Sequence, residues 1–210
     1  CLFYAIMSTY LINLRNLNQV ISLLKNKTIC LLFGGIICIV GLDVGMNVFT
    51  PKLLIENAEL TKEIASYGTS WYFAARTLGT LCGVILLAKF SEIYYYRINM
   101  FIVLIALSCI YWIHSQYIIL LLVCIIAFAM SSIFAVIYSL ALHTLPYKTN
   151  EISGLMITGI SGGSIIPPLM GVCADYTGSQ SGSILVMLIC VIYLILCSFH
   201  KFKTIHTKPH

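Results

Sequence analysis

The stretch that decides the fold reads Ile29-Cys-Leu-Leu-Phe-Gly-Gly-Ile-Ile-Cys-Ile-Val-Gly-Leu-Asp-Val-Gly-Met-Asn-Val48. An apolar run of about 20 residues is long enough for an α-helix to cross the ~30 Å hydrocarbon core of a bilayer. Its one charged residue is Asp43, which lies between Gly41 and Gly45. A charge at this depth costs at least ~2.5–3.5 kcal/mol and is kept mainly where it faces a substrate or ion path. The stretch predicts a membrane-spanning helix beside a polar cavity.

The composition of the whole chain indicates the same class. Of 210 residues, 60% are hydrophobic and 9% are charged, and the mean hydropathy is +0.99. A soluble domain carries about 25% charged residues. The apolar runs are continuous, whereas the strands of an outer-membrane barrel alternate in hydropathy. We therefore predict an all-α membrane protein, and because the basic residues behind the net charge of +5 are scattered between spans, we predict no nucleic-acid partner.

Cysteine and histidine do not form the spacings of a metal site. The nine cysteines include no C-x-x-C pair and lie mostly within apolar runs, which indicates packing. The five histidines lie at span ends or in the tail, without an H-E-x-x-H motif. The sequence predicts no metal and no bound cofactor.

Six apolar runs are long enough to cross a membrane, and turn residues such as Pro51 and Pro146 separate them. The predicted spans are 29–50, 66–88, 97–114, 117–142, 152–174 and 182–200. We interpret residues 1–12 as the end of a truncated transmembrane helix. Residues 13–27 have apolar residues at helical spacing and are expected to form a cytoplasmic amphipathic linker. Residues 28–200 would then be a six-helix unit and 201–210 a cytoplasmic tail.

Basic residues are distributed unequally between the two sides of these spans. One side carries nine: Arg15, Lys25, Lys27, Lys89, Arg97, Lys148, Lys201, Lys203 and Lys208. The other carries only Lys52 and Lys62, in the loop 51–65. Cytoplasmic loops are enriched in Lys and Arg. We expect the linker and the carboxyl tail in the cytoplasm and the loop 51–65 outside.

A second ionisable residue, Arg76, lies in the span after Asp43. Asp43 and Asn47 are four residues apart and share a helix face, and Arg76 is one turn from Tyr72. Two interpretations stay open. Asp43 and Arg76 could form a structural ion pair, or they could line a central cavity and bind a polyhydroxylated ligand, whose C–H faces pack on aromatic rings. The two overlap, because such a pair can open to bind.

Small residues are concentrated at positions that suit close helix packing. G-x-x-x-G pairs occur at Gly41/Gly45, Gly79/Gly83 and Gly159/Gly163, which favours a tight multi-helix bundle. The span 152–174 also contains Pro167 and Pro168, which remove two backbone donors. We expect an interrupted helix there, serving either as a packing kink or as part of a transport site.

Several strings within these spans resemble one known family. They are Cys38-Ile-Val-Gly-Leu-Asp-Val-Gly45, Ala75-Arg-Thr-Leu-Gly-Thr80, Ile137-Tyr-Ser-Leu-Ala-Leu142 and Ser161-Gly-Gly-Ser-Ile-Ile-Pro-Pro-Leu-Met-Gly-Val-Cys-Ala-Asp175. From about Leu24 to His200, the chain resembles the carboxy-terminal six-helix half of a major facilitator superfamily transporter. The closest resemblance is to the fucose:proton symporter family of sugar transporters.

The resemblance implies where a sugar would bind. The family's sugar-contacting positions fall on Asp43, Asn47, Tyr72, Arg76 and Phe134. Asp43 replaces the family's usual glutamine or glutamate, Asn47 stands where an aromatic residue can occur, and Ala135 replaces a common proline. The resemblance implies that the family's proton-coupling carboxylates belong to an amino-terminal six-helix half, which we expect to be missing here.

The resemblance also implies the function. We expect transport of a monosaccharide with proton symport by alternating access, driven by the proton gradient, in the inner (plasma) membrane. The expected partners are the sugar, the lipid bilayer and the missing amino-terminal half. Alternatives are an efflux transporter of the same superfamily and a non-transporting nutrient sensor. A membrane-embedded enzyme is not expected, because the short loops lack convergent His, Asp or Ser residues.

Overall fold

The computed structural model describes residues 22–58, 61–113 and 115–200, and most of these are helical. The helices are α2 (Lys27–Ala58), α3 (Lys62–Lys89), α4 (Glu92–Ile110), α5 (Gln116–Met130), α6 (Ile133–Thr144), η1 (Pro146–Lys148), α7 (Thr149–Thr158), η2 (Gly159–Ser161), α8 (Gly162–Thr177) and α9 (Ser181–Ser198). The predictions for residues 1–12 and 201–210, and for most of 13–27, lie outside the described residues.

The prediction of six membrane-spanning helices is confirmed. The candidate spans are Lys27–Glu56, Lys62–Lys89, Glu92–Ile110, Gln116–Thr144, Pro146–Thr177 and Ser181–Ser198. The largest differences are of six residues: the first span continues through Pro51 to Glu56, and the fifth begins at Pro146. The third span begins at Glu92, five residues before the predicted start. Ser91 caps this helix, because its Oγ accepts a hydrogen bond from the Tyr94 N–H at 3.3 Å. Glu92 in the first turn also suits the positive end of the helix dipole.

Two of the six spans are interrupted near their middles. The fourth changes from α5 to α6 at Ser131 and Ser132, and the Ser131 hydroxyl donates to the Phe128 carbonyl at 2.8 Å. Such local bonds compete with regular helix geometry. The fifth span narrows to the 3₁₀ turn η2 between α7 and α8. The expected interruption is therefore present, but the change in helix type lies at the glycine-rich segment, and Pro167 and Pro168 lie within α8.

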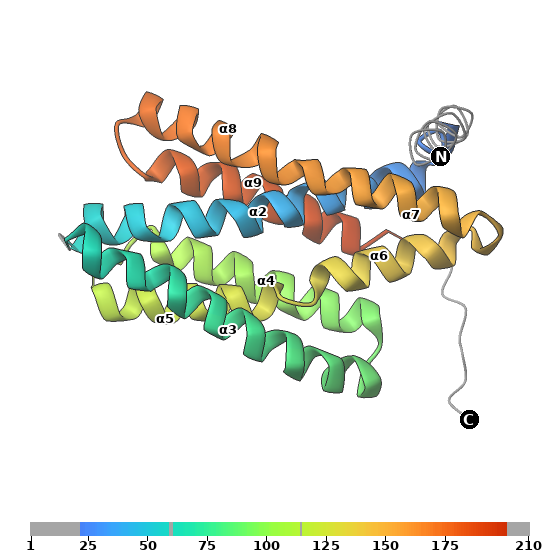
Figure 1. The fold of residues 1–210 in the computed structure, drawn as a ribbon, viewed down its shortest axis with the longest axis horizontal. Helices are drawn as coiled ribbons and strands as arrows, with labels where there is room; N and C mark the ends of the chain where they lie inside the picture. The colour runs from blue at the N-terminus through green and yellow to red at the C-terminus, as the bar shows by residue number, and fades with distance from the viewer. Residues whose placement is uncertain (1–21, 59–60, 114, 201–210) are drawn as a thin grey trace, which may run out of the picture.

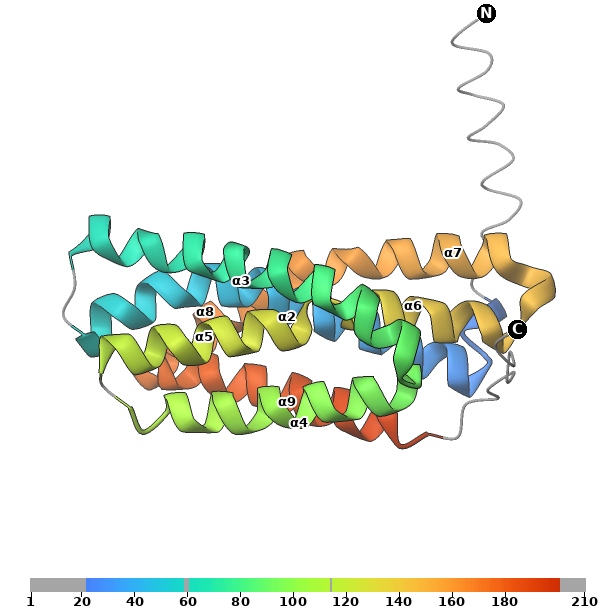
Figure 2. The same ribbon diagram turned by 90° about the horizontal axis from the view of Figure 1, so that it is seen from below.

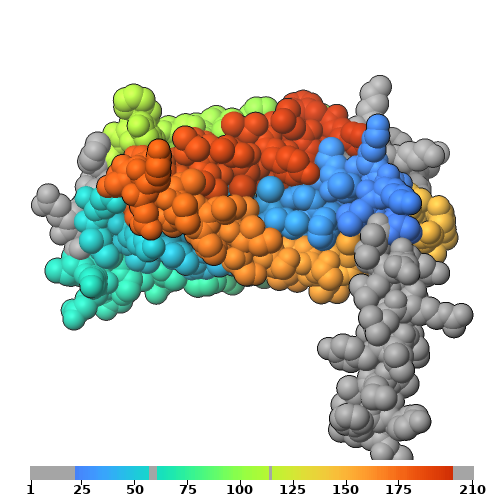
Figure 3. All heavy atoms as spheres, turned by 90° about the horizontal axis from the view of Figure 1, so that it is seen from above, coloured from blue at the N-terminus to red at the C-terminus, as the bar shows by residue number. Residues whose placement is uncertain are grey.

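The helices run side by side along the long axis of the molecule, with α2 at the centre (Figures 1 and 2). α2 packs against α3, α5, α6, α8 and α9. Its fully buried side chains include Leu32, Ile36 and Leu42. Seen from the side shown in Figure 3, α8 and α9 cover one face of α2. α2 is therefore the helix around which the other spans pack.

The tight multi-helix bundle predicted from the glycine pairs is confirmed, because a Cβ on Gly41, Gly79 or Gly159 would lie closer than 3.0 Å to an atom of a neighbouring helix. Beside the third pair, a Cβ on Gly162 would lie 2.6 Å from the Ile37 Cα, so α2 and α8 meet nearly backbone to backbone. A Cβ on Gly79 would lie 2.6 Å from the Phe128 carbonyl oxygen of α5. Real Cβ atoms do not approach other atoms so closely, and glycine is what permits these two crossings.

The helix ends group into two sets at opposite ends of the bundle (Figure 1). At one end, Thr28 of α2 lies 3.2 Å from the His200 ring, and Arg97 of α4 donates twice to the Ser198 carbonyl, at 3.1 and 2.9 Å. At the other end, the Glu56 carboxylate accepts from the Gln180 N–H at 3.1 Å. These contacts hold α2 against α9 at both ends of the bundle, and the middle of α2, which contains Asp43, is left to face the interior.

Candidate functional site

The two ionisable residues predicted from the sequence meet in the structure. Asp43 of α2 and Arg76 of α3 form a salt bridge between Oδ2 and Nη1. The Tyr72 hydroxyl donates to the other carboxylate oxygen, Asp43 Oδ1, at 2.6 Å. Both oxygens of the carboxylate are therefore engaged, one by a cation and one by a neutral donor. This arrangement compensates the cost of a carboxylate at bilayer depth.

The pair borders a cavity of about 300 Å³. Its lining residues are Ile39, Val40, Asp43, Arg76, Met130, Ser131, Phe134, Ala135 and Ile160. The Asp43 side chain is 16% exposed and that of Arg76 is 36% exposed, so the guanidinium is the more accessible group. A cavity with mostly apolar walls and a few convergent polar groups is the usual form of a small-molecule site.

Both helix interruptions contribute to the wall of this cavity. Ser131 lies at the junction of α5 and α6, and Ile160 lies in η2. Asp43, Arg76, Ser131 and Ile160 all lie close to the middle of their spans. The cavity is therefore at mid-membrane depth, where irregular backbone is tolerated only if it is buried in protein or lines a cavity.

Three of the five predicted site residues line the cavity together, namely Asp43, Arg76 and Phe134. The Phe134 ring stacks on Tyr138, with centroids 6.1 Å apart. Tyr72 is fully buried and touches the site only through Asp43. Asn47 lies one turn along α2 and is not among the lining residues, and its buried Oδ1 has no hydrogen-bond partner among the described residues.

Sequence reasoning did not single out Ser131, Met130 or Ile160 as lining residues. The pair Ser131-Ser132 within an otherwise apolar span was the available indication, because adjacent hydroxyl residues in a membrane helix weaken it locally. Ile160 carries no such indication, since its place depends on how α7 and α8 pack against α2. Among the described residues, no group of three His, Cys, Asp or Glu residues could hold a metal ion.

The site contains the features of both interpretations made from the sequence. The ion pair is formed, as the structural interpretation requires. The cavity beside it is open, as the ligand-binding interpretation requires. A half-exposed guanidinium next to a more buried carboxylate leaves donor N–H groups that can face a ligand while the pair stays intact.

Six membrane-crossing helices around a charged mid-membrane cavity define a polytopic membrane protein. A family model described as Major Facilitator Superfamily matches residues 22–209, and the chain belongs to that superfamily. The superfamily points to a transporter rather than an enzyme.

Two curated relatives come from Helicobacter pylori. Each is named "Putative glucose/galactose transporter", one from strain ATCC 700392 / 26695 and one from strain J99 / ATCC 700824. Each is 27% identical to this chain over 175 residues, which is 80% of the chain and 42% of the relative. The chain thus spans less than half the length of these relatives.

Proposed function

We propose that this chain is the carboxy-terminal six-helix half of a sugar transporter and that the cavity beside Asp43 and Arg76 binds the sugar. The observation that carries the proposal is the position of an opposed charge pair in a cavity at mid-membrane depth. An intramembrane charge that only stabilised the fold would not need an open cavity next to it. The names of the Helicobacter pylori relatives support a hexose-like substrate.

The chemistry of the lining suits a monosaccharide. Asp43 would accept hydrogen bonds from hydroxyl groups, Arg76 would donate to hydroxyl and ring oxygens, and Ser131 can do both. The ring of Phe134 offers a flat apolar surface for the C–H face of a pyranose. Tyr72 would act through the carboxylate, because its hydroxyl holds Asp43 Oδ1 and leaves Oδ2 for Arg76 or the ligand.

The mechanism we propose is proton symport by alternating access. Rocking of two six-helix halves about a fixed midplane site exposes that site to each side in turn. The interruptions at Ser131–Ser132 and at Gly159–Ser161 border the cavity and are the places where α5–α6 and α7–α8 can bend with little cost. By family resemblance, the proton-carrying carboxylates belong to the other half.

A second candidate function is efflux of an amphipathic compound. The observation that favours it is the apolar character of most of the cavity wall, which includes Ile39, Met130 and Ile160. The two functions differ in their competitors: a hexose transporter is inhibited by unlabelled hexoses at the site, whereas an efflux transporter is inhibited by lipophilic cations or phenols. The same purified protein can be tested with both sets.

The proposed orientation gives a direct prediction. The connections at one end of the bundle carry Lys25, Lys27, Lys89, Arg97 and Lys148, whereas the other end carries Lys52 and Lys62. An alkaline-phosphatase reporter inserted near Asn57 should be active outside the cytoplasm. A fluorescent reporter fused after His210 should fold in the cytoplasm. The reverse pattern would contradict the positive-inside assignment.

The proposed division into halves gives a second prediction. The chain alone should catalyse no saturable uptake of labelled hexose in proteoliposomes, because one wall of its cavity is supplied by another six-helix unit. Co-expression with a matching amino-terminal half should restore uptake, and an amino-terminal half from an unrelated superfamily member serves as the control. Saturable uptake by the chain alone would rule out the half-transporter proposal.

A further inference from the structure

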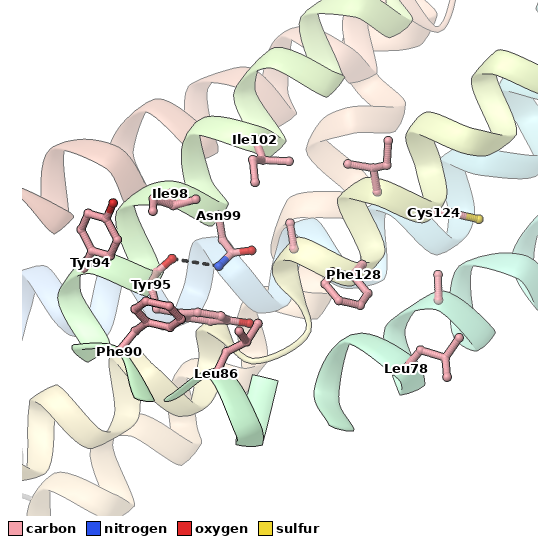
Figure 4. Close-up of a pocket in the computed structure, with 13 residues that line it drawn as sticks. Leu78, Leu86, Phe90, Tyr94, Tyr95, Ile98, Asn99, Ile102, Cys124 and Phe128 are labelled. Atoms are coloured by element: carbon pink, nitrogen blue, oxygen red, sulfur yellow. Dashed lines mark hydrogen bonds between the residues drawn. The ribbon is translucent and has the colours of Figure 1, made fainter. Parts of the chain in front are cut away.

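A second hollow is larger than the charged cavity and has a different set of lining residues, which Figure 4 shows. It has a volume of about 550 Å³ and is bordered by α3, α4 and α5. The lining residues are Ala75, Leu78, Leu86, Phe90, Tyr94, Tyr95, Ile98, Asn99, Ile102, Cys124, Ile125, Phe128 and Ala129. None of these lines the charged cavity, so the two are separate. We call this hollow the α3–α4 groove.

The α3–α4 groove is open at the surface and almost entirely apolar. Leu78 is 60% exposed, and Tyr94, Ile98 and Ile102 on the facing helix are exposed as well. α5 packs against both α3 and α4 and forms the floor of the groove. α6 packs mainly against α2, so this floor ends at the junction of α5 and α6. In a membrane-spanning bundle, an open apolar groove of this kind is accessible to lipid acyl chains.

The groove is long enough to cover one leaflet of a bilayer. Along α3 it runs from Ala75, at the middle of the span, to Phe90, immediately after the last helical residue. At 1.5 Å per residue this distance is about 22 Å. Half of a ~30 Å hydrocarbon core is about 15 Å. The groove therefore extends from the bilayer midplane to one interface.

The interfacial end of the groove presents a positive charge. Lys89 is exposed next to Phe90, and no carboxylate pairs with it among the described residues. The nearby Glu92 carboxylate instead accepts from the Ser139 hydroxyl at 3.1 Å, on α6. Phe90 and Tyr94 are aromatic side chains of the type enriched at the headgroup level. An exposed lysine at this depth favours an anionic headgroup.

We propose that the α3–α4 groove binds one acyl chain of an anionic phospholipid from the leaflet at the Lys89 end of the bundle. The acyl chain of the lipid lies along Leu78, Ile98 and Ile102, and its phosphate lies beside Lys89. Under the orientation proposed above, this is the cytoplasmic leaflet. The bound lipid would fill a hollow that the helices leave open between α3 and α4.

The test is a lipid titration of the purified, delipidated chain in detergent, followed by native mass spectrometry. The probes are dioleoyl phosphatidylglycerol and dioleoyl phosphatidylcholine. The wild type should retain one phosphatidylglycerol, with phosphatidylcholine bound about fivefold more weakly, since one lysine near an anionic surface contributes about 1 kcal/mol. Lys89→Gln should remove that preference, and Lys25→Gln, at another exposed lysine, should keep it.

The groove itself is tested by filling it. Ile102→Trp should weaken binding of both lipids at least tenfold, and Ile105→Trp, on the same helix but outside the groove, should leave both unchanged. Thermal unfolding in detergent checks that the variants fold. If Ile102→Trp does not fold, Ile98→Trp repeats the test. Wild-type lipid binding by a folded groove-filled variant would overturn the proposal. Equal binding of the two lipids by the wild type would also overturn the proposal. A wild-type dimer that dissociates in the groove-filled variant would do the same, because a second copy of the chain would then occupy the groove.

Discussion

Asp43→Asn, in the chain reassembled with its matching half, should weaken sugar binding by roughly ten- to a hundredfold while the protein still folds. A hydrogen bond to a charged group contributes about 1.5–3 kcal/mol, and the amide that replaces the carboxylate provides only a neutral acceptor. The substituted side chain keeps its shape and can still accept from the Tyr72 hydroxyl, so packing at the site is preserved. Equilibrium binding of labelled hexose, with thermal unfolding measured on the same sample, checks this result.

Arg76→Ala should reduce affinity at least as much, because it removes a ligand donor and leaves Asp43 as an unpaired buried charge. The structural interpretation of the pair predicts a different pattern. In that case each single change would lower the unfolding temperature sharply, and Asp43→Asn combined with Arg76→Gln would restore both stability and uptake. Arg97→Ala serves as the control, because Arg97 bonds the Ser198 carbonyl far from the cavity. Wild-type affinity in a stable Asp43→Asn protein would remove Asp43 from the binding site.

Gly162→Ala should destabilise the six-helix bundle by about 3 kcal/mol. The added Cβ would lie 2.6 Å from the Ile37 Cα and would also overlap the Ile37 carbonyl oxygen. Backbone atoms cannot rotate away as a flexible side chain can, so α2 and α8 would have to separate. Insertion of a methyl group into a well-packed interior typically costs 1–3 kcal/mol, and a backbone clash is at the upper end of that range. Denaturant unfolding in mixed micelles measures the difference.

The same helix offers a matched control. Gly171 lies two to three turns further along α8, and a Cβ there would meet no atom within 4 Å. Gly171→Ala should therefore be neutral or stabilising, since alanine is favoured over glycine in a helix interior by roughly 0.5–1 kcal/mol. Equal destabilisation by the two substitutions would show that the α2–α8 crossing is not the cause.

The number, length and approximate limits of the membrane spans could be predicted from the sequence. Each follows from local properties: an apolar run of span length, and turn residues between runs. The third span shows the limit of this approach, because Glu92–Arg97 is too polar to be recognised as helix until the Ser91 cap and the contact of Arg97 with α9 are known. The close packing at the glycine pairs could also be predicted, since small residues at this spacing have few other uses.

The candidate site could be predicted in part, for a related reason. Asp43 and Arg76 are recognisable because charge within a membrane span is costly wherever the chain folds, and Phe134 entered through family resemblance. Only the tertiary structure decided that Tyr72 is buried behind the carboxylate, that Asn47 is not among the residues lining the cavity, and that Ser131 and Ile160 complete the wall. These placements depend on the rotation of each helix about its axis, which is set by the side chains of its neighbours. A run of apolar residues specifies that a helix crosses the membrane, but the direction in which each of its faces points is determined only when the helices pack together.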